Sequence, residues 1–322
     1  MSTPQVSVVL PVHNGARYVA RAVASVLHQH SVAHEVIVVD DGSTDATPAL
    51  LAAMTDPRLH VIRTPPRGLV AALNTGVAAA RSPAIARMDA DDIALPHRLA
   101  TQLAALTHAD LVFSAAELID TDDRPLGHHP CPSLSPAERR AALLGERTAP
   151  PLIHPSATIR RDTLLAVGGY RDSPACEDHE LWLRLIDRAR FAMLAEPLLR
   201  YRINLAGESR RKTTTQGVSN LVNCVAYRLR TATGIDLLDD RPDLHARLRG
   251  EAQRRTAPLF AHLTAARATR TALRRRSPKA LTSAIRNLPL AAVPLLRLEA
   301  QRRALFALQS PLLATARTWL AQ

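Results

Sequence analysis

Residues 6–27, VSVVLPVHNGARYVARAVASVL, contain one complete strand–turn–helix unit. The run VSVVL is apolar and mostly β-branched, without polar alternation, which is typical of a strand buried on both faces. The polar turn HNG follows it, and Val19, Val23 and Val26 then recur at helical spacing. A strand of this kind needs helices on both faces of its sheet, so the stretch predicts a parallel α/β fold.

The same alternation continues along most of the chain. Further strands are expected in EVIVV, LHVIR, AIARMD, ADLVFSAA, SATIRR and the final pair ARFAML and PLLRYR, with helices between most of them. The segment 120–150 is rich in Pro, Gly and charge, and reads as an excursion or flap. The predicted fold class is therefore α/β, with a doubly wound, mainly parallel sheet that binds ligands beyond the carboxyl ends of its strands.

Strand signals stop near residue 210, where we place a domain boundary between an α/β domain at 1–210 and a helical, Arg-rich region at 211–322. Prolines are expected to break the helices of the second region, at Pro258, Pro278, Pro289 and Pro294. The stretch 251–322 holds 13 Arg and Lys residues against two acidic ones, so it carries +11 of the formal net charge of +12. This imbalance points to an acidic partner for the tail.

Two interpretations of the basic tail stay open. It is either a solvated helical appendage that packs on the α/β domain, or a peripheral attachment to an anionic membrane surface through Arg heads and Leu, Phe and Trp faces. No nucleic acid partner is expected, because aromatic residues make up only 3% of the chain and no reading motif occurs.

The predicted location is cytoplasmic, with peripheral attachment at the inner face of the membrane under the second interpretation of the tail. The first ten residues lack a basic region of the signal-peptide type, and no apolar run approaches the length of a spanning helix. The three cysteines are widely spaced and odd in number, which suits a reducing compartment.

An acidic stretch, MDADDIALP, begins at the end of a predicted strand and places Asp89, Asp91 and Asp92 within four positions. Helix capping by Asp91 or Asp92 would account for only one of them. Carboxylate oxygens in this arrangement suit Mg²⁺ or Mn²⁺, which usually complete their coordination with water and substrate phosphates. We therefore expect a divalent cation here that bridges to a diphosphate.

A second acidic pair, Glu177 and Asp178 in EDHELW, opens a predicted helix. Such a pair either supplies favourable charge at a helix N-terminus or provides a general base. The patterns GxGxxG, GxxxxGK[ST] and HExxH are absent, which argues against dinucleotide oxidoreductases, P-loop enzymes and zinc proteases.

Six stretches taken together resemble family 2 glycosyltransferases of the GT-A fold. They occur in the family's order over roughly residues 5–205: SVVLPVHNGARYVARAVASVLHQ, EVIVVDDGSTDAT, GLVAALNTGVAAARSPAIARMDADD, HPSATIRRDTLLAVGGY, EDHELWLRL and LLRYR. The resemblance implies inverting transfer of a sugar from a nucleotide-diphosphate sugar to a hydroxyl of a sugar or lipid-linked glycan acceptor, with Mn²⁺ or Mg²⁺. The place of such a step would be polysaccharide, lipid-linked glycan or glycoconjugate synthesis.

The resemblance also implies roles for particular residues. Asp91 would bind the metal, and Asp178 would be the catalytic base. Donor-binding positions would be Pro11, Val12, His13, Asn14, Asp40, Asp41, Arg67, Asn74 and Asp89. The acceptor cleft would be bordered by Gly168, Gly169, Tyr170 and Glu177. The QxxRW motif of processive members is absent and no spanning helices follow, so one transfer per encounter is expected.

Two alternatives remain beside the transferase. A non-catalytic member could bind a nucleotide or a partner through the same fold, since a fold does not fix a function. A nucleotidyltransferase is the enzymatic alternative, but its glycine-rich, arginine-containing amino-terminal loop is missing.

Overall fold

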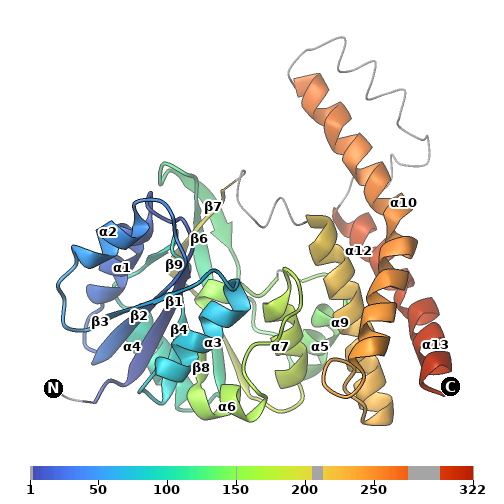
Figure 1. Cartoon of the computed structure of the whole chain (residues 1–322), viewed down its shortest axis with the longest axis horizontal. Coiled ribbons are helices and arrows are strands. Elements are labelled where there is room, and N and C mark those ends of the chain that lie inside the picture. The colour runs from blue at the N-terminus through green and yellow to red at the C-terminus, as the bar shows by residue number, and fades with distance from the viewer. Residues whose placement is uncertain (1–2, 150, 205–212, 275–297, 322) are drawn as a thin grey trace. The chain divides into compact units, whose positions relative to one another are not determined.

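The structure is a computed structural model that describes residues 3–149, 151–204, 213–274 and 298–321 (Figure 1). The chain divides into two compact units. The sheet unit consists of residues 1–139, 149–172 and 184–210, and the helical unit of residues 140–148, 173–183 and 211–322. Each unit is described by itself below.

One mixed sheet forms the centre of the sheet unit. Its strands are β1 (Val6–Val12), β2 (His34–Asp41), β3 (Leu59–Thr64), β4 (Ala84–Arg87), β5 (Ile93–Ala94), β6 (Leu111–Ile119), β7 (Pro125–His129), β8 (Thr158–Arg160) and β9 (Phe191–Arg202). Their order is β3-β2-β1-β4-β8-β6-β9-β5, with β7 paired to β6. The first four strands in this order are parallel, as is the β6–β9 pair, while β5, β7 and β8 run antiparallel to their neighbours. The predicted α/β class is confirmed.

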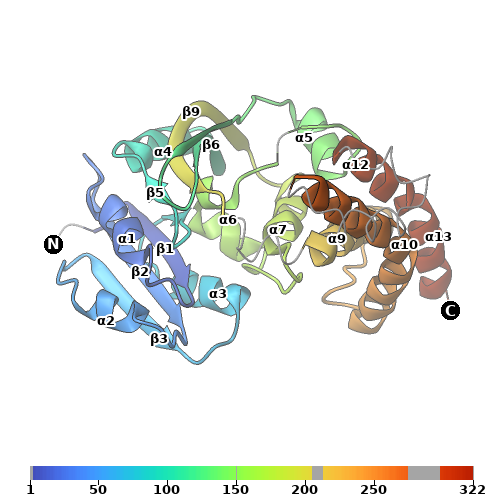
Figure 2. The same ribbon diagram turned by 90° about the horizontal axis from the view of Figure 1, so that it is seen from above.

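Helices cover both faces of the parallel strands, as Figure 2 shows for α1, α2 and α3. The helices of the sheet unit are α1 (Val19–Leu27), α2 (Thr47–Ala52), α3 (Leu69–Ala79), α4 (Arg98–Leu106) and α6 (Arg161–Ala166), with the short 3₁₀ turn η1 (His154–Ser156). Two more, α5 (Pro136–Leu143) and α7 (Glu177–Leu185), have residues in both units.

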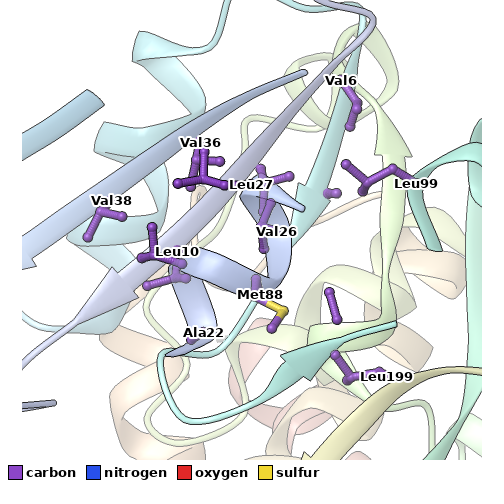
Figure 3. Close-up of a cluster of buried hydrophobic side chains, with 14 of the residues drawn as sticks. Val6, Leu10, Ala22, Val26, Leu27, Val36, Val38, Met88, Leu99 and Leu199 are labelled. Atoms are coloured by element: carbon purple, nitrogen blue, oxygen red, sulfur yellow. The ribbon is translucent and has the colours of Figure 1, made fainter. Parts of the chain in front are cut away.

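The core explains why β1 lacks alternation. Val6 and Leu10 point to one face, where they belong to a buried cluster with Val26 of α1 and Leu99 of α4 (Figure 3). The intervening Val9 points to the other face, where α3 packs. Gly76 of α3 lies so close to the Val9 side chain that a Cβ atom there would overlap it. Both faces of β1 are therefore dry, as the unbroken apolar run predicts.

The end of the sheet unit differs from the prediction in one element. The stretches ARFAML and PLLRYR form one strand, β9, rather than two. Pro197 has no N–H to donate to a ladder, and the pairing of β9 with β6 shifts register at Ala115, the partner of Pro197. The strand absorbs the proline as an irregularity. The 120–150 segment contains β7 and α5.

The described part of the helical unit consists mostly of four helices: α9 (Thr213–Thr233), α10 (Pro242–Arg274), α12 (Leu298–Ala307) and α13 (Gln309–Leu320). Apolar residues of α9, α10 and α13 form its core, among them Val222, Leu248 and Leu312. The segments 140–148 and 173–183 join this unit: Gln309 Nε2 donates to the Leu144 carbonyl at 2.8 Å, and Ser173 Oγ donates to Asn223 Oδ1 at 3.0 Å.

The predicted helix break at Pro258 is wrong, because α10 continues through it. The residue is exposed, so water can satisfy the carbonyl that loses its partner. Pro278, Pro289 and Pro294 lie outside the described residues. Among the described helices, none combines the length and apolar composition that a membrane span requires.

Candidate active site

The carboxyl ends of three neighbouring strands meet at one edge of the sheet. β1 pairs in parallel with both β2 and β4, so the residues that follow Val12, Asp41 and Arg87 emerge on the same side. Ligands of doubly wound sheets bind beyond such an edge. The predicted donor-binding residues 11–14 and 40–41 and the acidic stretch at 89–92 come from these three strand ends.

The acidic stretch forms one compact group of carboxylates. Asp89, Asp91 and Asp92 each offer an oxygen, and these oxygens lie within 4.8 Å of one another. Asp89 Oδ1 pairs with Arg87 Nη1 at 2.6 Å, and Asp92 Oδ1 accepts the backbone N–H of Arg202 at 2.8 Å. Among the described residues, Asp92 Oδ2 is buried without a hydrogen-bond partner.

The surroundings of Asp91 and Asp92 disfavour the charged forms of their carboxyl groups. Burial, and then the neighbouring Asp89 carboxylate, raise the pKa of Asp91 to about 6. Burial raises the pKa of Asp92 well above its ordinary value, and the charges of Asp89 and Asp91 add to the effect. A hard divalent cation bound by these oxygens would remove the repulsion, and three carboxylates are the ligand type that Mg²⁺ and Mn²⁺ prefer. The residues present therefore fit such a cation.

Three buried arginines surround the group, and sequence reasoning assigned none of them a role. Arg87 lies at the end of β4, Arg98 in α4 and Arg202 at the end of β9. Arg98 Nη2 donates to the carbonyl oxygens of Arg87 and Pro155 at 2.7 and 2.8 Å, so it supports the backbone that leads into the acidic stretch. The available signal was an arginine at a strand end, in ARMD and again in RYR.

The carboxylate of Asp41 is bound by the chain itself. Its Oδ1 accepts the N–H of Arg67 at 2.8 Å and the hydroxyl of Thr64 at 3.3 Å, and its Oδ2 accepts the N–H of Gly68 at 2.8 Å. Gly68 has φ +90, a conformation that favours glycine. The structure thus brings Arg67 to Asp41 through its backbone. In the same way, Asp40 Oδ1 accepts the N–H of Ser43 at 2.9 Å.

The turns after β1 and β2 are joined to each other. His13 Nδ1 donates to the carbonyl of Asp41 at 2.7 Å. Asn14 has φ +53, its N–H donates to Ser43 Oγ at 2.8 Å, and its Oδ1 accepts the N–H of Thr44 at 2.8 Å. Residues 13–14 and 40–44 therefore form one hydrogen-bonded surface at the edge of the sheet.

Asn74 of α3 is brought to the predicted acceptor segment. Its Nδ2 donates to the Tyr170 carbonyl at 2.8 Å, and its Oδ1 accepts the Tyr170 N–H at 3.0 Å. Gly168 and Gly169 precede this contact with φ of +81 and +71. The hydroxyl of Tyr170 lies 3.0 Å from His154 Nε2. One amide side chain thus fixes the backbone that follows the two glycines.

The second acidic pair lies in the helical unit. Glu177 and Asp178 stand in the first turn of α7, and Asp178 Oδ1 accepts the N–H of His179 at 2.7 Å. His179 Nε2 donates to the Leu143 carbonyl at 2.8 Å, and burial lowers the pKa of this histidine. A carboxylate at the start of a helix is stabilised in its charged form, as a base requires.

The sequence profile described as Glycosyl transferase family 2 matches residues 7–168 of this chain. The chain belongs to glycosyl transferase family 2. The succinoglycan biosynthesis protein ExoO of Rhizobium meliloti (strain 1021) is 36% identical over 162 residues, which cover 49% of this chain and 44% of ExoO. This chain thus matches less than half the length of that relative. The predicted family is confirmed.

Among the solved structures that share the fold are those of TarS and PcManGT. TarS of S. aureus, residues 1–349 in complex with UDP-GlcNAc, has a TM-score of 0.56 and 15% identity, over 98% of this chain and 92% of TarS. The mannosyltransferase PcManGT of Pyrobaculum calidifontis, in complex with GDP-Man and Mn²⁺, has a TM-score of 0.52 and 22% identity, over 96% of this chain and 88% of PcManGT. At these identities the likeness establishes the fold, and the predicted GT-A type is confirmed.

Proposed function

We propose that this family 2 glycosyltransferase transfers a sugar from a nucleotide-diphosphate sugar to a hydroxyl acceptor, with inversion at the anomeric carbon and with a divalent cation. The observation that carries the proposal is the group of Asp89, Asp91 and Asp92 at the shared carboxyl edge of the parallel strands. The Mn²⁺ and nucleotide sugar in the PcManGT complex support it by likeness of fold.

Asp91 would hold the cation, with Asp89 and Asp92 beside it. When bound, Mn²⁺ or Mg²⁺ supplies Lewis-acid stabilisation of the charge that develops on a departing diphosphate. Asp89 is already paired with Arg87. Asp92 is 1% exposed and accepts the N–H of Arg202, which leaves Asp91 as the more accessible carboxylate for a metal.

The turns after β1 and β2 would receive the nucleotide, through residues 11–14 together with Asp40 and Asp41. A carboxylate has about four acceptor positions, and Asp41 uses three of them on Thr64, Arg67 and Gly68. The remaining position is free to accept an N–H of a base. Asn74 likewise keeps one amide hydrogen and one lone pair after binding Tyr170.

Asp178 would act as the base that removes the proton from the acceptor hydroxyl. As the acceptor oxygen bonds to the anomeric carbon, the proton passes to Asp178 and the bond to the diphosphate oxygen breaks. A positioned base contributes about 10²–10⁴-fold to such a step. Glu177 and the segment Gly168–Tyr170 would border the acceptor.

Turnover of an Asp178→Asn variant tests this assignment. Donor binding should stay nearly unchanged, while turnover falls at least about a hundredfold, because only the proton acceptor is lost. Asp162→Asn is a matched control: Asp162 is exposed in the first turn of α6 and accepts the next N–H at 2.7 Å, as Asp178 does. Near-normal turnover of the Asp178 variant would remove it as the base.

A panel of nucleotide sugars with Mn²⁺ tests the function as a whole. We expect donor hydrolysis with at least one base and sugar, and products that carry the opposite anomeric configuration by NMR. The product should gain a single sugar per encounter, in keeping with the absent QxxRW motif. Polysaccharide or glycoconjugate synthesis is the expected setting, as the name of ExoO suggests for that relative. A panel without any hydrolysis or transfer would contradict the proposal.

The basic tail would hold the enzyme at an anionic membrane surface that carries a lipid-linked acceptor. Among the described residues, Arg303 and Phe306 of α12 are exposed three positions apart, so they share one side of that helix. The full chain should float with vesicles that contain anionic phospholipid and not with zwitterionic ones. Replacing exposed Arg303 and Arg317 by Gln should weaken flotation; equal flotation on both vesicle types would reject the electrostatic attachment.

A further inference from the structure

The guanidinium of Arg202 binds the acidic stretch at a backbone carbonyl rather than at a carboxylate. Its side chain is only 1% exposed at the end of β9. Nε donates to the carbonyl oxygen of Asp91 at 2.7 Å, Nη1 to the carbonyl oxygen of Asp120 at 2.6 Å, and Nη2 to Asp123 Oδ1 at 2.6 Å. All three nitrogens of the guanidinium therefore have partners, and the carboxylate of Asp91 is not one of them.

Arg202 also binds Asp92, the next residue of the acidic stretch. The backbone N–H of Arg202 donates to Asp92 Oδ1 at 2.8 Å, and its guanidinium lies 4.3 Å from the centre of the Tyr18 ring. One residue of β9 thus fixes both the Asp91 backbone and the Asp92 side chain, more than 100 positions away along the chain.

The partners of Arg202 on its other side belong to the turn at residues 120–123 between β6 and β7, which we call the acidic turn. Asp123 also pairs with Arg21 of α1, and its φ is +66. The carbonyl of Thr121 accepts the hydroxyl of Tyr18 at 3.2 Å, and Asp122 pairs with Arg17 at 2.9 Å. Contacts from α1 and from the two residues before it therefore fix the turn at the place where Arg202 meets it.

Arg202 and a bound cation would compete for the same carboxylate oxygens of Asp91. A buried guanidinium beside carboxylates favours direct ion pairs with them, commonly through two parallel hydrogen bonds. Such a pair with Asp91 would occupy the oxygens that a cation needs. The acidic turn supplies a carbonyl and a carboxylate in their place, so Arg202 is satisfied while the Asp91 oxygens stay available.

We propose that Arg202 is a positioning residue for the Asp91 metal ligand, and that the acidic turn, through Asp123, keeps its guanidinium off the Asp91 carboxylate. The inference rests on the proposed function, because it concerns the cation site of that function. It assigns a role in metal binding to Asp123, a residue outside the group of three aspartates.

Binding of Mn²⁺ alone to the purified full chain, followed by electron paramagnetic resonance, tests the role of Asp123. Asparagine tolerates the left-handed backbone that Asp123 adopts, so Asp123→Asn removes the charge and leaves the turn intact. The amide keeps an acceptor for Nη2 but loses the negative charge. Arg202 should then favour the charged Asp91 carboxylate and weaken Mn²⁺ binding about tenfold or more, the range found for outer-shell partners of metal ligands.

Asp122→Asn is the matched control, since it neutralises the neighbouring carboxylate, which is 55% exposed and pairs with the exposed Arg17. It should change Mn²⁺ affinity less than about twofold, because exposed ion pairs contribute little. Equal Mn²⁺ affinity of wild type and Asp123→Asn would overturn the inference and leave the proposed function standing. Failure of the wild-type chain to bind Mn²⁺ would overturn both.

A double variant separates competition from simple loosening of the fold. Arg202→Gln alone should weaken Mn²⁺ binding, because the Asp91 backbone loses its donor. If Asp123 acts only through Arg202, adding Asp123→Asn to Arg202→Gln should weaken binding no further. Additive losses in the double variant would contradict the mechanism. Thermal unfolding of each variant checks that all are folded at the temperature of the measurement.

Discussion

Two pairs of adjacent aspartates lie at the same edge of the sheet and differ in the groups that surround their carboxylates. Asp40 and Asp41 end β2, and backbone N–H groups donate to both carboxylates. Asp91 and Asp92 follow β4, and there burial and like charge raise the pKa of both carboxyls. Acidic residues at a strand end can thus have different surroundings: one pair organises the turn around it, and the other lies where we propose that a cation binds.

The largest effect is expected from Asp91→Asn, which removes a carboxylate whose charged form burial and the neighbouring Asp89 disfavour. Mn²⁺-dependent transfer should fall at least about a hundredfold, since the carboxylate that we propose as the metal ligand is lost. Thermal stability without metal should be equal to or higher than that of wild type, because functional sites often carry destabilising charge. A transfer assay over a range of Mn²⁺ concentrations and a melting curve measure the two quantities.

An unchanged metal requirement in this variant would end the assignment of Asp91 as a ligand. A clear loss of stability without metal would show instead that protein groups stabilise the Asp91 carboxylate. Asp91 would then not differ from Asp41 of β2 in this respect.

The matching change in the other pair, Asp41→Asn, should lower stability without affecting metal binding. An amide in this place keeps one acceptor but turns a donor toward the N–H groups of Arg67 and Gly68. The free energy of unfolding should fall by about 1–3 kcal/mol, the cost of leaving a buried donor unsatisfied. Mn²⁺ affinity should stay close to wild type. Urea unfolding measures the free energy of unfolding, and electron paramagnetic resonance measures the Mn²⁺ affinity. A large loss of Mn²⁺ affinity would contradict the distinction between the two pairs of aspartates.

Glu35, at the opposite end of β2, provides a smaller effect that depends on pH. Burial by itself would raise the pKa of this carboxyl, but hydrogen bonds from Ser7 Oγ and from the backbone and guanidinium of Arg81 lower it overall. A lowered pKa in the folded state stabilises the protein above the unfolded value, about 4.3, and this stability is lost as the pH falls below it.

The stability difference between wild type and Glu35→Gln should therefore be present at pH 7, at about 1–2 kcal/mol, and shrink as the pH falls below about 4.3. Denaturant titrations at pH 7 and at a pH below that value measure it. A difference that grows on acidification would contradict the direction of the pKa shift.

Much of the sheet and one part of the site were predictable because local signals determine them. Unbroken apolar runs mark β1 and β2, and the acidic residues that close the predicted strands put Asp40 and Asp41 at the end of β2 and Asp89 just after β4. The role of Arg202 was not predictable, since its partners at 91 and 120–123 are distant in sequence and meet only through β6 and β9. Pro197 and Pro258 misled the interpretation because both are tolerated within regular structure: Pro197 at an irregularity of β9, and Pro258 on an exposed side of α10.

The helical unit has a consequence for how the protein is made. Three separate stretches of the chain build it, and the first two, 140–148 and 173–183, leave the ribosome long before helices α9 to α13. Until those helices arrive, Cys176 lacks the Gln216 carbonyl that its thiol contacts, and Leu144 lacks Gln309. Nascent chains should thus expose apolar segments that invite chaperones, and a fragment ending at residue 210 should aggregate rather than fold.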